Sequence, residues 1–391
     1  MPSESPPVTD ILYRSPALEV RRVVAGDGRR QVVTFDSYHE PHGLDRPGFG
    51  EAFFRSEGVT AIHVLSHAND WFQTSEIHEI IQIIRKASAA AERLLTYGSS
   101  MGGYGALRFA GPIGARAALA LSPQFSLDPR KAPFETRWSA DRRRIRFREE
   151  IDGPIMTGPC MILAYDPAIA ADRRHAELFA AATKVTLLPL PRSGHPVGGF
   201  LNDLKLLRPL VFNTLDGSFD PAAFLREAHG KRDRSAHWLA NLAEAQPAWR
   251  KACAVALARR AVAAAPDHPS LHDALARRLA AAGDFGQAIE VHRRVIAREP
   301  IADYQWSLSQ TLHASGDVAS ALQVAERLQR LAPETPGYHA WASSLREEQG
   351  DLAGAAMDMR AALWRDPRNR GYRWHYWRLQ LARLRQAVRG G

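Results

Sequence analysis

The C-terminal part of the chain repeats itself every 33 or 34 residues, which strongly restricts how the chain can fold. Prolines and Gly-Asp pairs recur in register, at Pro266, Pro300, Pro333 and Pro367 and at 283–284, 316–317 and 350–351. A small residue stands twelve positions before each proline: Ala254, Ala288, Ala321 and Ala355. Small residues let two antiparallel helices approach closely, and the proline ends the second helix of each unit. From about residue 235 the sequence therefore predicts stacked helix pairs without strands.

This period resembles the tetratricopeptide repeat, with units at 235–268, 269–301, 302–335 and 336–369 and a capping helix at 370–386. The first unit departs from the pattern, because Trp249 stands where the others have glycine. The resemblance implies a superhelix whose groove binds a protein or another macromolecular partner. Seven of the nine tryptophans fall in this half of the chain, and we expect packing between helices to bury most of them.

The N-terminal half alternates short β-branched runs with longer helical ones, which predicts an α/β domain with a mostly parallel sheet over 19–215. The expected strands are 31–35, 60–65, 94–97, 117–121, 160–165 and 184–190, and the expected helices are 74–91, 102–110, 173–182 and 198–215. Residues 122–159 interrupt this alternation with prolines and arginines, and we expect them to form a lid. Residues 1–18 are expected to be a flexible tail, and 216–234 a linker.

Composition narrows the class of protein. The formal net charge is +9, and the cationic residues are almost all arginine. An excess of positive charge that is dispersed along the chain more often keeps a protein soluble than binds nucleic acid. We therefore expect no nucleic acid as the main partner. Cys160 and Cys253 are expected to be buried and reduced, and neither a disulfide framework, a metal site nor a cofactor motif follows from them. No apolar run is long enough for a membrane span, and the N-terminus lacks signal-peptide features, so we expect a soluble cytoplasmic protein.

Residues 94–108 read LLTYGSSMGGYGALR, an apolar strand, a Gly98-Ser99-Ser100-Met101-Gly102 turn and the start of a helix rich in small residues. A serine at the centre of Gly-x-Ser-x-Gly stands on a strained strand-to-helix turn, where side chains at the glycines would collide with neighbouring elements. The pattern exposes the serine hydroxyl at the edge of the sheet. Ser100 is therefore the candidate nucleophile.

A carboxylate and a histidine follow in the order that such a serine needs. Asp166 ends the apolar run 160–165, and His195 lies in the loop after the next strand. With these residues, the first 215 residues resemble the α/β-hydrolase family, and the resemblance implies Ser100 as nucleophile, His195 as general base and Asp166 as its orienting acid. Asp172 lies in the same loop and is the alternative acid; we favour Asp166 because it terminates the strand directly.

The oxyanion of an acyl-transfer reaction needs two hydrogen-bond donors. One is expected to be the N–H of Met101, and the other that of Asp36 or Ser37, of which we take Ser37 as the candidate. Tyr104 is a candidate substrate-binding residue. His67 follows a strand near the same sheet edge, so it either contacts substrate or stabilises its loop. Two further histidines are expected to lie away from the site: His175 on the surface of a helix and His63 within a strand.

Together these features predict a serine hydrolase that cleaves an ester or thioester through an acyl-enzyme, joined to a repeat module for a partner. Amide cleavage and acyl transfer use the same groups and remain open. The alternative is a non-catalytic repeat scaffold with a vestigial hydrolase domain.

Overall fold

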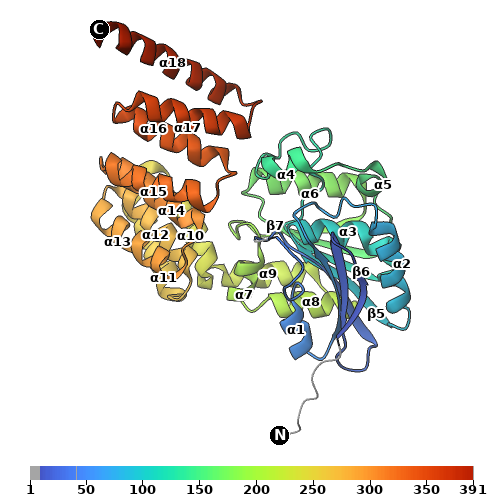
Figure 1. The fold of residues 1–391 in the computed structure, drawn as a ribbon. Helices are drawn as coiled ribbons and strands as arrows, with labels where there is room; N and C mark the ends of the chain where they lie inside the picture. The colour runs from blue at the N-terminus through green and yellow to red at the C-terminus, as the bar shows by residue number, and fades with distance from the viewer. Residues whose placement is uncertain (1–8, 41, 391) are drawn as a thin grey trace. The chain divides into compact units, whose positions relative to one another are not determined.

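The computed structural model describes residues 9–40 and 42–390 (Figure 1). The chain divides into two compact units, with the division between Trp238 and Leu239. The first unit contains the sheet, and the second consists of helices.

The first unit is built on an eight-stranded mixed sheet in the order β1-β2-β4-β3-β5-β6-β7-β8. The strands are β1 Thr9–Arg14, β2 Leu18–Val23, β3 Arg30–Phe35, β4 Thr60–Ser66, β5 Arg93–Ser99, β6 Ala117–Leu121, β7 Cys160–Tyr165 and β8 Val185–Pro189. The six strands from β4 to β8 are mutually parallel, whereas β1 and β2 pair antiparallel. The prediction of a mostly parallel sheet is thus confirmed, and its parallel strands end at one common edge.

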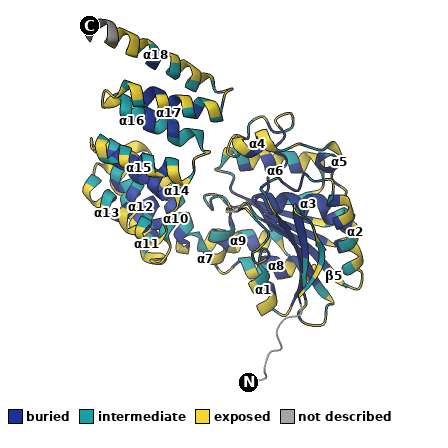
Figure 2. Cartoon of the chain, in the orientation of Figure 1, coloured by how far each residue is buried: buried dark blue, intermediate teal, exposed yellow. Residues whose placement is uncertain are grey.

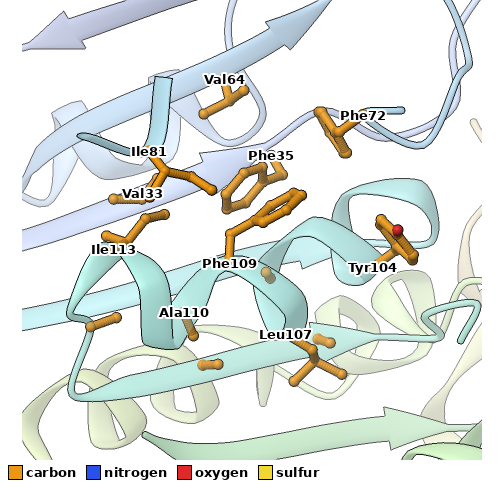
Figure 3. Packing of buried hydrophobic residues seen from close by; sticks show 14 of the residues in the cluster. Val33, Phe35, Val64, Phe72, Ile81, Tyr104, Leu107, Phe109, Ala110 and Ile113 are labelled. Carbon is orange, nitrogen blue, oxygen red and sulfur yellow. The ribbon is translucent and has the colours of Figure 1, made fainter. Parts of the chain in front are cut away.

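Helices cover both faces of this sheet, because the buried strands are apolar on both sides. They are α1 Glu51–Ser56, α2 Ile77–Ala87, α3 Met101–Ile113, α4 Ser139–Arg144, α5 Glu149–Asp152, α6 Ala170–Ala182, α7 Gly198–Asp203, α8 Leu207–Asp216 and α9 Pro221–Lys231. Alternate residues of β3 point to opposite faces: Val33 and Phe35 pack with α2 and α3 (Figure 3), and Val32 packs with α1 and α8. Each such fully buried side chain contributes about 1.5–3 kcal/mol.

Several sequence-based boundaries differ from the structure, and three of the differences change an element or a domain limit. The expected tail 1–18 contributes β1 and the start of β2; residues 1–8 lie outside the described residues. The expected linker 216–234 contains α9, whose Phe224 and Ala228 are buried against the sheet with α7 and α8. The expected helix 198–215 is two helices, α7 and α8. Apolar contacts along the short amphipathic α9 outweigh the Gly and charge content that suggested a linker.

The second unit is a helical repeat, as its period predicts. After α10 Ala236–Glu244 come α11 Lys251–Ala264, α12 Pro269–Ala282, α13 Phe285–Arg298, α14 Ala302–Ala314, α15 Val318–Leu331, α16 Pro336–Glu348, α17 Leu352–Arg365 and α18 Arg370–Gly390. Each Gly-Asp dipeptide forms the turn between the two helices of one repeat. Gly283, at a φ of 93°, ends α12 in the left-handed conformation, and the Asp284 side chain caps the N-terminus of α13.

Two expectations about buried residues are wrong. Cys160 and Cys253 are both exposed free cysteines. Helix packing also fails to bury most of the tryptophans of the second half, because Trp249, Trp364, Trp374 and Trp377 are between 61 and 75% exposed. The alanine-rich helices pack through small residues such as Ala288, Ala321 and Ala355, and the four exposed indole rings lie outside the clusters that these residues form.

Candidate active site

Ser100 stands on a strained turn between β5 and α3. Its φ is 52° and its ψ is −115°, and its N–H donates to the carbonyl of Leu121 at 2.8 Å. A Cβ at Gly98 would lie 2.2 Å from the main chain of Gly102, and a Cβ at Gly102 would lie 2.2 Å from the carbonyl of Phe35. These close approaches explain why both positions are glycine. The turn holds the hydroxyl of Ser100 at the carboxyl edge of the parallel strands.

A hydrogen-bonded chain connects Ser100 to a buried carboxylate. Ser100 Oγ lies 3.1 Å from His195 Nε2, and His195 Nδ1 lies 2.7 Å from Asp172 Oδ2. Asp172 is 2% exposed, whereas His195 retains partial exposure. With Nδ1 protonated and donating to Asp172, Nε2 is free to accept the serine proton. The structure therefore brings together a serine, an imidazole and a carboxylate in the order that nucleophilic catalysis uses.

The acid in contact with the imidazole is Asp172, so the preference for Asp166 is corrected. Asp166 accepts hydrogen bonds from the N–H groups of Ala168, Arg192 and Gly194, each at 2.9 Å. It thereby fixes the loop that precedes His195. One of these amides, that of Ala168, belongs to the loop of Asp166 itself, and the other two belong to the loop after β8, so the carboxylate is already occupied by main-chain donors. The first turn of α6 instead carries Asp172 to the imidazole.

Gln124 is a residue of the site that the sequence reasoning missed. Its Nε2 donates to Ser100 Oγ at 3.2 Å, and its Oε1 accepts from Trp71 Nε1 at 3.1 Å. Gln124 is fully buried. Its position three residues after β6 was the available signal, because it places this amide at the sheet edge where Ser100 stands.

The loop after β3 lies against the nucleophile turn through Ser37, whose Oγ donates to the carbonyl of Ser99 at 3.1 Å. Asp36 plays a different part, because its N–H donates to the carbonyl of Val64 at 3.1 Å. Its carboxylate accepts from the N–H of Ser66 and from Arg46, and burial raises the pKa of Asp36 to about 6. This leaves the amides of Ser37 and of Met101, the first residue of α3, as the candidate oxyanion donors.

The segment 122–159 contacts the site through Arg137 and Trp138. Arg137 Nη1 forms an ion pair with Asp172 Oδ1 at 2.7 Å, and its Nη2 bonds Glu135 at 2.7 Å. The Trp138 ring lies 5.8 Å from the His195 ring, centroid to centroid, and the Arg137 guanidinium lies 4.6 Å above Trp138. Residues of the expected lid thus contact both His195 and Asp172.

Behind this contact lies a second buried pair, Glu135 and His175. His175 Nε2 lies 3.0 Å from Glu135 Oε2, and His175 Nδ1 accepts from the N–H of Phe125 at 3.1 Å. Burial lowers the pKa of His175. Burial alone would raise the pKa of Glu135, but hydrogen bonds from His175 and Arg137 outweigh it and lower that pKa. The expectation of a surface position for His175 is wrong, because α6 turns this residue inward.

The remaining predicted residues lie outside the Ser100 contacts. Tyr104 is buried, and its hydroxyl accepts from Gln73 at 2.7 Å and donates to Asp152 at 3.1 Å, which makes it part of the interior rather than a substrate contact. His67 is exposed, and its main chain bonds Ala17 and Gly43, which fits the loop-stabilising role. His63 is buried in β4, as expected, 2.6 Å from Thr34 Oγ1.

No family model and no curated protein matches. Solved structures that match include TTC0263, a tetratricopeptide-repeat protein of Thermus thermophilus, at 20% identity over 46% of this chain and 99% of that one, with a TM-score of 0.35. MamA MSR-1 matches at 18% identity over 44% of this chain and 95% of its own, with a TM-score of 0.31. SycD of Yersinia enterocolitica, solved with a peptide of YopD, matches at 14% identity over 29% of this chain and 93% of its own, with a TM-score of 0.27.

Within the described residues, no helix is both long and apolar enough to cross a membrane.

Proposed function

We propose that the first unit is a serine hydrolase of the α/β-hydrolase type. The observation that carries this proposal is the chain from Ser100 through His195 to Asp172, with the serine on a strained turn. Its support is threefold: the serine follows the central parallel strand β5, the acid follows β7 and the base follows β8, and the order Ser, Asp, His is that of this fold.

In the proposed reaction, His195 Nε2 accepts the proton of Ser100 Oγ as the oxygen attacks a carbonyl carbon. The amides of Met101 and Ser37 donate to the oxyanion that forms. The tetrahedral intermediate collapses to an acyl-enzyme, and the protonated His195 donates its proton to the leaving group. A water molecule, deprotonated by His195, then attacks the acyl-enzyme, and His195 returns this proton to Ser100 Oγ as the acid is released.

The substrate class that we propose is an ester or thioester. Trp138 presents an aromatic surface beside His195, which favours an apolar group on the substrate. Transfer of the acyl group to an acceptor other than water would use the same residues.

The test is labelling of the full-length protein with a fluorophosphonate probe, combined with turnover of a small activated ester. Wild type should label at Ser100, and Ser100→Ala and His195→Ala should lose labelling while their thermal unfolding stays nearly unchanged. Loss of a triad residue lowers turnover by up to about a million-fold. Ser56→Ala, at an exposed serine of α1, is the matched control and should label like wild type. Labelling of Ser100→Ala at the wild-type level would contradict the assignment.

A second candidate function is a protein-binding scaffold in which the hydrolase-like site is inactive. The extended helical repeat favours it, since such arrays present long surfaces to partners. A wild-type protein that neither labels nor hydrolyses, yet retains a partner in pull-down experiments, would favour this second function over the first.

A further inference from the structure

The last helix of the repeat unit, α18, has an unusual charge. Its 21 residues include six arginines and neither aspartate nor glutamate, while the formal net charge of the whole chain is +9. The positive excess is therefore concentrated on one helix, contrary to the dispersed charge expected from composition. The carboxylate of Glu347 in α16 bonds His375 and Arg378 of α18.

One face of α18 packs on the preceding helices. Leu379 is fully buried in a cluster with residues of α17, and Tyr372 and Tyr376 pack against the same cluster. These positions are spaced by four and three residues, so they share one face of the helix. This contact fixes α18 onto the repeat unit.

The opposite face carries an apolar stripe that is exposed. Trp374, Trp377, Leu381 and Leu384 are spaced by three, four and three residues and are 56 to 67% exposed. Figure 2 shows α18 mostly in the colours of exposed and intermediate residues. At about 100° per residue this stripe lies roughly opposite Leu379. Arg370 and Arg385 flank it.

A helix face of a repeat array that is exposed to water is normally polar. The outer face of α18 instead combines two tryptophans, two leucines and arginines, and such a face needs a partner. A second α18 would set arginines against arginines, so charge disfavours a second copy of the chain.

The shape of the surface and its residues identify the partner. A peptide is usually bound in a groove, and the pocket of about 360 Å³ in the repeat unit is lined by α13, α14 and α15 rather than by α18. A convex helix with tryptophan and leucine on one stripe and arginines beside it suits the interface of an anionic bilayer, where indole rings enter the headgroup layer and guanidinium groups contact phosphates.

We infer that α18 docks the protein onto an anionic phospholipid surface, lying parallel to the membrane with Trp374, Trp377, Leu381 and Leu384 toward the lipid. This inference does not depend on the proposed hydrolase function. Docking requires both apolar contact of the tryptophans and leucines with lipid and attraction between the arginines and the anionic headgroups. The experiment tests these two contributions with separate variants.

The experiment is co-sedimentation of the full-length protein with vesicles of phosphatidylcholine, with and without phosphatidylglycerol. Wild type should bind the anionic vesicles, bind neutral ones much more weakly, and dissociate as salt is added. The double variant Trp374→Ala/Trp377→Ala should bind at least about tenfold more weakly, because two exposed aromatic rings lose their lipid contact. Arg370→Gln/Arg385→Gln should reduce binding to anionic vesicles while leaving the residual binding to neutral ones unchanged.

Matched controls are Trp249→Ala, at another tryptophan that is highly exposed, and Arg260→Gln, at an exposed arginine of α11. Both should bind like wild type, and every variant should keep the wild-type melting temperature because the changed side chains are exposed. The inference is overturned if wild type ignores anionic vesicles or if the controls reduce binding as much as the α18 variants. It is also overturned if the α18 variants lose binding to polyglutamate or to a single-stranded oligonucleotide but not to vesicles.

Discussion

Arg137 Nη1 lies 2.7 Å from Asp172 Oδ1, on the carboxylate whose other oxygen holds His195. The arginine comes from the segment 122–159, and its second nitrogen bonds the buried Glu135. A carboxylate held from both sides can neither rotate nor withdraw, so the imidazole keeps its orientation toward Ser100. The segment expected to be a lid thus also holds Asp172 in place.

We expect Arg137→Gln to lower kcat by about tenfold with little change in KM, because the loss concerns the orientation of Asp172 rather than substrate binding. Arg137→Lys should restore part of the rate, since it keeps the charge but not the two-pronged geometry. Steady-state kinetics on a small activated ester provides the measurement. A rise in KM with kcat unchanged would instead assign Arg137 to substrate binding.

The variants Asp172→Asn and Asp166→Asn should have different effects, because we expect Asp172 to orient His195 and Asp166 to hold the loop that precedes it. Asp172→Asn should lower turnover by about ten-thousand-fold with the fold intact, because an amide favours the wrong imidazole tautomer. Asp166→Asn should act mainly on stability, at about 1–3 kcal/mol, since it weakens the bonds from buried amides. Turnover and thermal unfolding are measured for both. The opposite order of activity losses would return the role of acid to Asp166.

Stability should depend on pH through Glu135. The pKa of Glu135 in the folded protein lies below the ordinary value of 4.5. The contribution of its charge to the free energy of unfolding is therefore complete above about pH 4.5 and is lost as the pH falls through the lower pKa of the folded state. Glu135→Gln should therefore lower the free energy of unfolding by about 3–5 kcal/mol at neutral pH, the range found when one partner of a buried ion pair is removed, and by progressively less in acid. Denaturant titrations across this range measure the difference. A difference independent of pH would show that the charge of Glu135 does not stabilise the fold.

Gly102→Ala should disrupt the nucleophile turn, because its Cβ would overlap the carbonyl of Phe35 in the neighbouring strand. We expect destabilisation of at least about 1–3 kcal/mol, together with loss of probe labelling. The matched control is Gly198→Ala at the start of α7, where the nearest atom to the new Cβ is 3.9 Å away. That variant should stay within about 0.5 kcal/mol of wild type. Equal effects of the two changes in denaturant unfolding would refute this account of the turn.

A fragment that ends at Trp238 should fold and label, whereas one that ends at Asp220 should aggregate. The shorter fragment lacks α9, so removal of Phe224 and Ala228 would expose apolar side chains of the cluster beneath them. Solubility, circular dichroism and probe labelling distinguish the two. Two equally soluble and active fragments would show that α9 is dispensable for the first unit.

The sequence by itself determined the elements whose signals are local. The spacing of prolines and Gly-Asp pairs predicted the helix pairs, since a left-handed glycine and an N-capping aspartate act within a few residues. The pattern around Ser100 predicted the strained turn for the same reason. Apolar strands such as 117–121 and 160–165 were predicted with their observed bounds because buried parallel strands are continuous apolar runs.

Tertiary structure alone decided which groups meet. Asp166 and Asp172 follow the same strand, and only the folded loop shows that main-chain amides occupy the first while the first turn of α6 brings the second to His195. The contacts of Gln124 with Ser100 and of Arg137 with Asp172 also depend on the fold, because these partners lie far apart in the chain; the position of Gln124 after β6 indicates only the sheet edge. Exposure of Trp374 and Trp377 likewise depends on which face of α18 packs on its neighbours. Local chain chemistry fixes where helices, strands and turns form, but contacts between distant residues depend on how those elements pack together.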